Sequence, residues 1–281
     1  MTLIGAGLSH RTSPIEERER FALSTLELPA AMAHFGAAFG HTVILSTCNR
    51  TEIYVHPSER EIEPLELLLE LAAFKRIELD PLPRFYGLRG REVPEHLFRV
   101  AAGIDSMVLG ESEVLGQVRS AMSAAHEAKT LDHTLSRLVH DALRAGRRAR
   151  SETHIGRYAV SVSSAAVSLV RTHVPDWRNS RALVVGAGAA GKLAARALRD
   201  QGVDRIVVTS RTQERAADVA AYLGGRVVPF RELETALANA DVVITSSSAE
   251  DYLITPELVA RSRGAVETPV VFMDVAVPRD V

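Results

Sequence analysis

The segment Gly186-Ala187-Gly188-Ala189-Ala190-Gly191 constrains the fold of this 281-residue chain more than any other. It follows an apolar run at residues 182–185 and opens a helical pattern that extends through Arg199. In a GxGxxG turn the first glycine permits the tight turn, the second lets a pyrophosphate approach the backbone, and the third allows close packing of the helix. The phosphates then lie at the positive end of the helix. The segment therefore predicts a dinucleotide-binding loop.

Strand and helix patterns alternate around this loop. Continuous apolar runs, typical of strands buried on both faces, occur at residues 182–185, 205–209, 226–229, 241–245 and 270–274. Helical patterns begin between them at Ala189, Gln213, Arg231 and Pro256. Residues 181–281 are therefore predicted to form a Rossmann-type domain with a doubly wound parallel sheet.

The end of the second predicted strand indicates which dinucleotide is bound. NAD-binding sheets usually carry an acidic residue there, whereas this chain has Ser210 and Arg211. A hydroxyl and a guanidinium suit a 2′-phosphate, so NADPH is favoured over NADH. The alternative interpretation of Arg211 is a solvated loop residue.

The N-terminal part of the chain follows a different order of elements. Extended runs at residues 2–8, 41–47, 52–56 and 84–88 are separated by helical patterns, which begin near Pro14, Pro29 and Ile62. The order β-α-β-β-α-β is typical of a ferredoxin-like, split βαβ domain. From Pro94 to Arg150 the pattern is almost wholly helical, and a further helix at 159–174 leads into a turn-rich segment at 175–180.

We therefore predict an α+β domain with a helical subdomain at residues 1–156, a connecting helix and linker at 157–180, and the α/β dinucleotide domain at 181–281. A single cysteine excludes an intrachain disulfide framework. The N-terminus lacks the pattern of a signal peptide, and no run of about eighteen apolar residues occurs. The formal net charge of −2 gives no global footprint of a nucleic-acid binder. We expect a soluble cytoplasmic protein, with no metal site.

The lone cysteine, Cys48, follows an apolar run and is succeeded by Asn49 and Arg50. A cysteine is most often a small buried hydrophobe. On an extended segment, however, Cys48 and Arg50 would point the same way, and the guanidinium would lower the pKa of the thiol. A thiolate can take an acyl group from an activated ester, and the thioester can then accept a hydride. One thiol together with one hydride donor thus suggests reduction of a thioester.

The stretch from Gly103 to Gln117 gathers polar residues around an apolar turn, among them Ser106, Glu111 and Gln117. These side chains would orient a small polar substrate; helix capping and ordinary surface roles are the alternatives. His96 at the start of the preceding helix has the chemistry of an acid or base, although capping and surface roles are commoner. The basic run at residues 144–150 is usually a solvated helix face, and phosphate contact is the alternative.

Together, residues 46–52, residues 103–117, the segment Ser151-Glu152-Thr153 and the glycine loop closely resemble the glutamyl-tRNA reductase family. The resemblance extends from residues 7–10 to residues 274–279. It implies NADPH-dependent reduction of glutamyl-tRNA(Glu) to glutamate-1-semialdehyde, the first step of five-carbon tetrapyrrole (porphyrin, haem) biosynthesis. It also implies glutamate-1-semialdehyde aminomutase as a partner.

The resemblance implies a role for each matching position. The family's nucleophile falls on Cys48, and its activity-linked histidine falls on His96, which would protonate the departing ribose oxygen. The family's substrate-binding positions fall on Thr47, Asn49, Arg50, Ser106, Glu111, Ser112, Glu113 and Gln117. Its cofactor loop falls on Gly186, Ala187, Gly188, Ala189, Ala190 and Gly191. Arg50 would grip the substrate carboxylate in a bidentate pair.

Two departures from the family pattern bear on this interpretation. Many members have Pro-Gln where this chain has Ser112-Glu113, so Glu113 either faces the α-amino group of the substrate or points away. Members also continue through a long helix into a helical dimerisation domain; that segment is absent here, so the family's homodimer is not expected. Two other functions stay open: a non-catalytic glutamyl-tRNA-binding or regulatory protein, and an NADP-dependent small-acid dehydrogenase similar to shikimate dehydrogenase.

Overall fold

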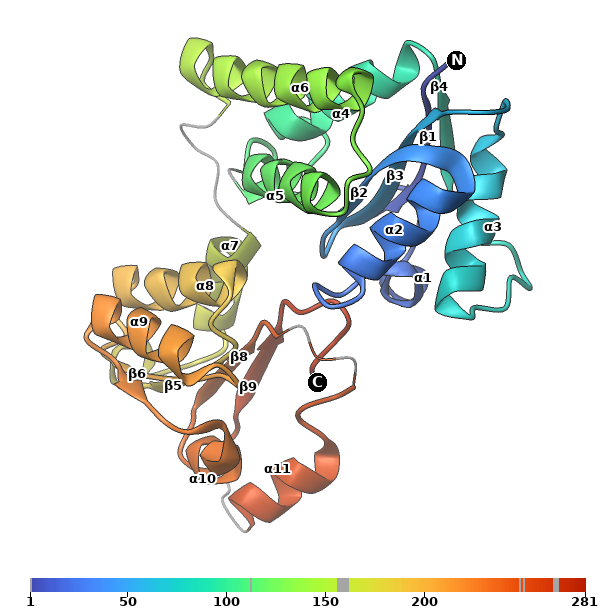
Figure 1. The fold of residues 1–281 in the computed structure, drawn as a ribbon. Helices are drawn as coiled ribbons and strands as arrows, with labels where there is room; N and C mark the ends of the chain where they lie inside the picture. The colour runs from blue at the N-terminus through green and yellow to red at the C-terminus, as the bar shows by residue number, and fades with distance from the viewer. Residues whose placement is uncertain (1, 112, 156–161, 248, 250, 265–267) are drawn as a thin grey trace. The chain divides into compact units, whose positions relative to one another are not determined.

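Figure 1 shows the computed structural model of the chain, which describes residues 2–111, 113–155, 162–247, 249, 251–264 and 268–281. The chain forms two compact units, Met1–Ala159 and Val160–Val281. Each unit has its own sheet and its own apolar core. The two units are therefore described separately.

The first unit is built on a four-stranded antiparallel sheet in the order β2-β3-β1-β4. The strands are β1 (Ile4–Ser9), β2 (Gly40–Ser46), β3 (Arg50–Pro57) and β4 (Tyr86–Arg89). The helices between them are α1 (Ile15–Phe21) and α2 (Leu28–Phe39), which precede β2, and α3 (Pro64–Lys75), which precedes β4. This order and pairing confirm the ferredoxin-like prediction.

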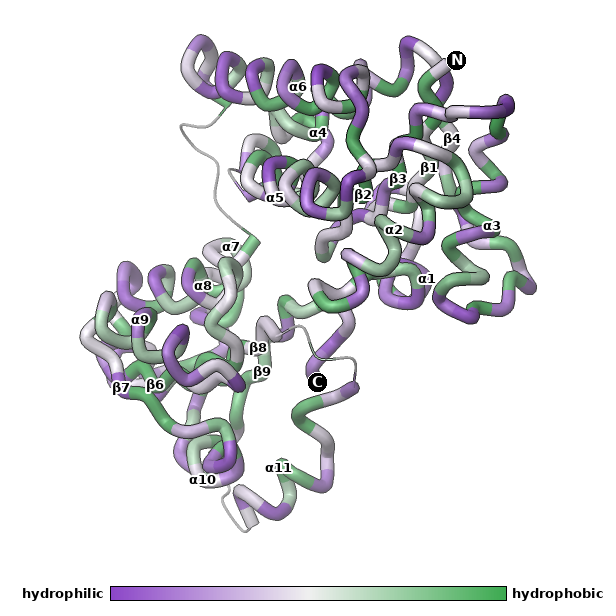
Figure 2. The backbone as a smooth tube through the Cα atoms, in the orientation of Figure 1, coloured by the Kyte–Doolittle hydropathy of each residue, from purple (hydrophilic) through white to green (hydrophobic). Residues whose placement is uncertain are grey.

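A helical subdomain completes the first unit, as predicted. It consists of α4 (Glu92–Ala102), α5 (Glu113–Glu127) and α6 (His133–Glu152). Asp132 begins α6, because its carboxylate accepts a hydrogen bond from the Leu135 amide at 2.8 Å. Figure 2 shows α6 as alternating hydrophilic and hydrophobic turns, and its apolar residues join the core of the sheet.

One glycine lets the three subdomain helices approach closely. A Cβ atom on Gly146 of α6 would lie 2.5 Å from the Ala101 carbonyl oxygen of α4 and 2.7 Å from Leu115 of α5. Any larger residue at this position would have to push at least one helix away. The spacing of α4, α5 and α6 is therefore set at Gly146.

The second unit contains a five-stranded parallel sheet in the order β7-β6-β5-β8-β9. The strands are β5 (Arg181–Val185), β6 (Arg205–Thr209), β7 (Arg226–Val227), β8 (Val242–Thr245) and β9 (Val271–Asp274). The helices are α7 (Val162–Arg171), α8 (Ala189–Asp200), α9 (Gln213–Leu223), α10 (Leu233–Ala238) and α11 (Pro256–Arg263), with short 3-10 turns at Trp177–Asn179 and Phe230–Glu232. Apolar clusters lie on both faces of the sheet, which confirms the doubly wound prediction.

Three predicted boundaries in this unit differ from the structure. Strand β7 has two residues rather than four, and α10 begins at Leu233, after a 3-10 turn, rather than at Arg231. The helix expected to connect the domains, α7, packs on α8 within the second unit. Ser163 of α7 donates a hydrogen bond to the Ala190 carbonyl at 3.1 Å, so α7 supports the glycine loop.

Two kinds of feature are absent from the part of the chain that the structure describes. No helix there is long and apolar enough to cross a membrane. Within the same residues, no group of three or more histidine, cysteine, aspartate or glutamate side chains has the arrangement of a metal site.

Candidate functional site

Cys48 lies at the tip of the hairpin that joins β2 to β3. The Thr47 amide donates to the Arg50 carbonyl at 2.8 Å, and Thr47 Oγ1 accepts from the amides of Asn49 (3.1 Å) and Arg50 (3.2 Å). These bonds turn the chain within two residues. The prediction of an extended segment, with Cys48 and Arg50 on one side, is therefore wrong at this point.

Two residues from the first part of the chain anchor the tip. The His10 amide donates to the Asn49 carbonyl at 2.9 Å, and Arg18 Nη1 donates to the Cys48 carbonyl at 2.7 Å. Asn49 is buried, whereas Cys48 is half-buried. The thiol thus sits on a turn whose backbone is fixed on both sides.

The environment of Cys48 favours the protonated thiol. Burial, followed by the carboxylates of Glu111 and Glu113, raises the pKa of Cys48 to about 11, and Arg18 acts in the opposite direction. The arginine that favours the thiolate is therefore Arg18, which the sequence interpretation missed, and not Arg50. The sequence around Cys48 could not indicate that Arg18 lies near the thiol, because Arg18 belongs to helix α1.

Arg50 is directed into the first unit, where it is 3% exposed. Its Nη1 lies 2.7 Å from Glu52 Oε1, and its Nη2 donates to the Asp105 carbonyl at 2.5 Å. Burial would lower the pKa of Arg50, but the negative charge of Glu52 raises it overall. The guanidinium is therefore charged and held in one plane.

Glu52 is the acceptor at the centre of this network. Besides Arg50, it accepts hydrogen bonds from the hydroxyls of Tyr54 and Tyr86, and its Oε1 lies 2.9 Å from His96 Nε2. Although burial alone would raise it, Arg50 and His96 hold the pKa of Glu52 well below its ordinary value. Glu52 thus joins two predicted site residues, Arg50 and His96, through one buried carboxylate. Polar residues at alternate positions of one strand were the available sequence signal.

The loop between α4 and α5 is tied down from both ends. Gly103 ends α4 with a φ of 79°, and its carbonyl accepts from the Gly110 amide at 2.9 Å. Arg150 of α6 donates to the Gly110 carbonyl at 2.7 Å and also to the Glu111 carbonyl. Asp105 in this loop pairs with Arg11 at 3.0 Å. The loop is therefore held in place by residues from distant parts of the first unit.

Two predicted substrate residues of this stretch, Glu111 and Glu113, lie near enough to Cys48 to act on its thiol. Ser106 and Glu111 are buried, and Glu113 is the first residue of α5. Burial raises the pKa of Glu111, and burial together with the charge of Glu111 raises the pKa of Glu113. Gln117 is half-buried one turn further along α5, on the same side as Glu113. Ser112 lies outside the described residues.

The glycine loop of the second unit has the geometry of a phosphate cradle. Gly186 has a φ of 106°, and its amide donates to the Thr209 carbonyl at 2.9 Å. A Cβ atom on Gly191 would lie 2.1 Å from the Gly186 carbonyl oxygen, whereas one on Gly188 would meet nothing within 4 Å. The open side at Gly188, before the first turn of α8, fits a pyrophosphate. The residues therefore fit a dinucleotide.

Ser210 and Arg211, which are predicted to bind the 2′-phosphate of the cofactor, follow β6. Ser210 is half-buried and accepts a bond from the Thr212 amide at 3.4 Å, whereas Arg211 is exposed. Thr209, which sequence reasoning missed, is fully buried, and its Oγ1 has no hydrogen-bond partner among the described residues. An unpaired buried hydroxyl at the end of this strand is a further polar group beside the loop.

Gly188→Ala and Gly191→Ala are expected to separate binding from folding. Because the Cβ at 188 meets no protein atom, Gly188→Ala should leave thermal stability unchanged and weaken dinucleotide binding about tenfold or more. Gly191→Ala should lower stability, since its Cβ meets the Gly186 carbonyl. Fluorescence titration and thermal unfolding measure the two effects. Unchanged dinucleotide affinity in Gly188→Ala would contradict the cradle.

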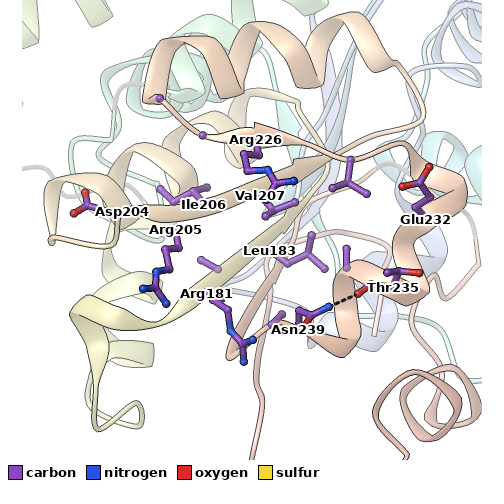
Figure 3. Close-up of a pocket in the computed structure, with 16 residues that line it drawn as sticks. Arg181, Leu183, Asp204, Arg205, Ile206, Val207, Arg226, Glu232, Thr235 and Asn239 are labelled. Carbon is purple, nitrogen blue, oxygen red and sulfur yellow. Dashed lines mark hydrogen bonds between the residues drawn. The ribbon is translucent and has the colours of Figure 1, made fainter.

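A separate hollow of about 560 Å³ lies in the second unit (Figure 3). Arg181, Arg205 and Arg226, the first residues of β5, β6 and β7, contribute to its lining. On the side of α10, Asn239 Nδ2 donates to the Thr235 carbonyl at 3.1 Å. Because it lies where the parallel strands begin, this hollow is at the opposite edge of the sheet from the glycine loop. It is therefore not the dinucleotide cradle.

Two sequence profiles match the chain. The profile described as "Glutamyl-tRNAGlu reductase, N-terminal domain" matches residues 6–153, and that described as "Shikimate / quinate 5-dehydrogenase" matches residues 168–281. These matches cover the unit that holds Cys48 and the unit that holds the glycine loop.

Individual relatives match nearly the whole chain. It is 40% identical over 301 residues to the glutamyl-tRNA reductase of Sorangium cellulosum (99% of this chain, 57% of that protein), and 41% identical over 286 residues to that of Moorella thermoacetica (100% and 65%). The solved glutamyl-tRNA reductase of Methanopyrus kandleri matches with a TM-score of 0.52 and 36% identity over 99% of this chain and 67% of that one. The chain thus spans 57% and 65% of the two sequence relatives. It belongs to the glutamyl-tRNA reductase family.

Proposed function

We propose that this protein reduces the glutamyl group of glutamyl-tRNA(Glu) to glutamate-1-semialdehyde with NADPH, the first step of five-carbon tetrapyrrole biosynthesis. The observation that carries the proposal is Cys48 on its anchored turn, beside the carboxylates of Glu111 and Glu113 and close to the Arg50 network. A hairpin tip held on both sides is a suitable support for a nucleophile, because the sulfur keeps one position.

The first chemical step would be acyl transfer to sulfur. The Cys48 thiolate attacks the ester carbonyl; the new C–S bond forms, and the bond from that carbon to the ribose oxygen of the tRNA breaks. The departing oxygen takes up a proton, for which His96 is the proposed donor. Glu52 holds the Nε2 side of the His96 ring at 2.9 Å, so it fixes the orientation of this group.

The second step would be reduction of the thioester. Residues 186–191 would hold NADPH, which would supply the hydride for this reduction, and Ser210 and Arg211 are proposed to bind its 2′-phosphate. The bond between the acyl carbon and the Cys48 sulfur then breaks, the sulfur leaves as a thiolate, and the aldehyde is released.

Arg50 is proposed to select the glutamyl carboxylate. A guanidinium carries five N–H donors, and each terminal nitrogen has two of them. The contacts to Glu52 and Asp105 account for one donor on each terminal nitrogen. The remaining donors suit a substrate carboxylate, with Thr47, Asn49, Ser106, Ser112 and Gln117 proposed as further contacts.

A single-turnover experiment with glutamyl-tRNA and NADPH tests this function. We expect one equivalent of NADPH to be oxidised per protein, with formation of the semialdehyde, and no oxidation with uncharged tRNA or free glutamate. Reduction of a free small acid without tRNA would contradict the proposal and assign a dehydrogenase. Tight binding of glutamyl-tRNA without aldehyde would instead assign a binding protein.

A further inference from the structure

The loop that follows β8 lies against the glycine loop. The Ser246 amide donates to the carbonyl of Val185, the last residue of β5, at 2.9 Å. A Cβ atom on Gly186 would lie 2.8 Å from the Ser246 carbonyl oxygen, and one on Gly191 would lie 2.7 Å from Ser246 Oγ. These distances leave no room for a side chain between the two loops. The position of the loop after β8 therefore bears directly on the dinucleotide cradle.

The order of the strands indicates which half of a dinucleotide this loop would meet. The pyrophosphate fits at Gly188, after β5, and Ser210 and Arg211, after β6, are proposed to hold the 2′-phosphate on the adenosine side. In the sheet order β7-β6-β5-β8-β9, β8 lies on the opposite side of β5 from β6. The nicotinamide half, on the far side of the pyrophosphate, is therefore expected over the ends of β8 and β9.

Asp280 holds the loop after β8 in place. It is fully buried, and both of its carboxylate oxygens accept hydrogen bonds from one residue of that loop: Oδ2 from the Ser247 amide at 2.8 Å, and Oδ1 from the Ser247 hydroxyl at 2.5 Å. Its backbone carbonyl accepts from the amides of Leu253 (2.8 Å) and Ile254 (2.9 Å), further along the same connection. A single buried residue thus binds the β8–α11 connection at two points.

Asp274, the last residue of β9, fixes Asp280 in turn. Its Oδ2 accepts from the amides of Asp280 at 2.7 Å and Val281 at 3.0 Å. Its Oδ1 accepts from the Thr245 hydroxyl at 2.8 Å and the Ala276 amide at 2.9 Å. Because Thr245 is the last residue of β8, Asp274 joins the ends of two neighbouring strands. The carboxylate of Asp280 is therefore held at a fixed place beside this end of the sheet.

Asp280 acts on the loop through its hydrogen bonds more than through its charge. Burial opposes the ionised form and raises the pKa of Asp280, while the bonds from Ser247 act in the opposite direction. The charge of Arg211 acts on Asp280 less than either of these. An asparagine at this position would keep one oxygen acceptor for the Ser247 amide, and its NH₂ group could donate to the Ser247 hydroxyl.

We propose that Asp280 is a positioning residue for the nicotinamide half of NADPH, because its carboxylate holds the loop after β8 at the end of the sheet where that half would lie. The proposal rests on the proposed function, from which it takes NADPH. In this role Asp280 touches no reacting atom; it fixes the surface against which the dihydronicotinamide ring would lie. A ring held in one orientation presents its hydride in one direction, which is a contribution of geometry.

Two ligands separate the halves of the cofactor. The first, 2′,5′-ADP, carries the adenosine half with its 2′-phosphate, whereas NADPH carries both halves and a fluorescent dihydronicotinamide ring. In Asp280→Ala we expect the affinity for NADPH to fall about tenfold and the fluorescence increase of the bound ring to be lost. The affinity for 2′,5′-ADP, measured by titration calorimetry, should change less than about twofold.

Three further variants complete the test. Asp280→Asn should bind NADPH within about twofold of the wild type, because it can keep both contacts to Ser247. Ser247→Ala loses only the hydroxyl contact, so it should stay folded and show a smaller loss in the same direction. Asp200→Ala, at the exposed far end of α8, is the matched control and should behave as the wild type.

The comparison of the two ligands decides the outcome. Equal losses of affinity for NADPH and 2′,5′-ADP in Asp280→Ala and Ser247→Ala would show a role in folding alone, which overturns the proposal. Unaltered NADPH binding in both variants overturns it as well.

These titrations contain no tRNA, so their result is distinguishable from failure of the proposed function. If Asp280→Ala loses NADPH selectively but the wild type forms no semialdehyde, the positioning role stands and the reaction is wrong. If the wild type forms the semialdehyde and both variants bind NADPH normally, the reaction stands and the positioning role is wrong.

Discussion

Cys48→Ser is expected to abolish formation of the acyl-protein and to lower the single-turnover rate by about three orders of magnitude or more. A serine hydroxyl ionises far less readily than a thiol, and an alkoxide would face the same two carboxylates. Acid-quenched transfer of labelled glutamate to the protein, with NADPH oxidation, measures the loss. Full turnover in this variant would rule out the thioester route.

Cys48→Ser should lose catalytic activity without losing stability or substrate binding. The backbone carbonyl of Cys48 accepts the hydrogen bond from Arg18, and that contact does not depend on the side chain at position 48. We therefore expect unchanged thermal stability and unchanged affinity for glutamyl-tRNA. A loss of affinity equal to the loss of rate would assign Cys48 a structural role instead.

Glu52→Gln is expected to destabilise the first unit by about 3–5 kcal/mol, because it leaves the buried charge of Arg50 without its partner. The reaction rate should fall as well, since His96 and Arg50 lose their shared acceptor. Urea unfolding at pH 7 measures the stability. Glu152→Gln, which removes an exposed ion pair with Arg148, is the control and should change little.

The pH dependence of stability gives a second test of Glu52. Its folded-state pKa lies below the ordinary value, so its ionised form stabilises the fold above the unfolded-state pKa of a glutamate. That stabilisation is lost as the pH falls below this value toward the folded-state pKa. Glu52→Gln should therefore lose stability less steeply in acid than the wild type. Parallel acid-unfolding curves would contradict the central role of this carboxylate.

Features with a strong local pattern could be predicted from the sequence. The Rossmann-type sheet follows from residues 186–191 and from apolar runs long enough to be buried on both faces. The ferredoxin-like unit follows from the order of its strands and helices. In the glycine loop, for example, the positive φ at position 186 requires a glycine, and this requirement is visible in the sequence as the first glycine of the motif.

The geometry around Cys48 could not be predicted in the same way. The turn depends on the Thr47 hydroxyl accepting from two amides, and no glycine or proline marks it. Arg18 reaches the Cys48 carbonyl across 30 residues of sequence, and His96 reaches Glu52 across 44. Contacts of this kind depend on tertiary packing, so the effect attributed to Arg50 belonged to a residue of another element.

Gly146 is the position at which three helices of the first unit, α4, α5 and α6, pack closely against one another. Helix α4 carries His96, α5 begins with Glu113, and Arg150 of α6 grips the Glu111 carbonyl. All three helices meet where a single hydrogen atom replaces a side chain. A side chain at position 146 would therefore disturb at once the helix that carries the proposed acid, His96, and the helix that begins with Glu113.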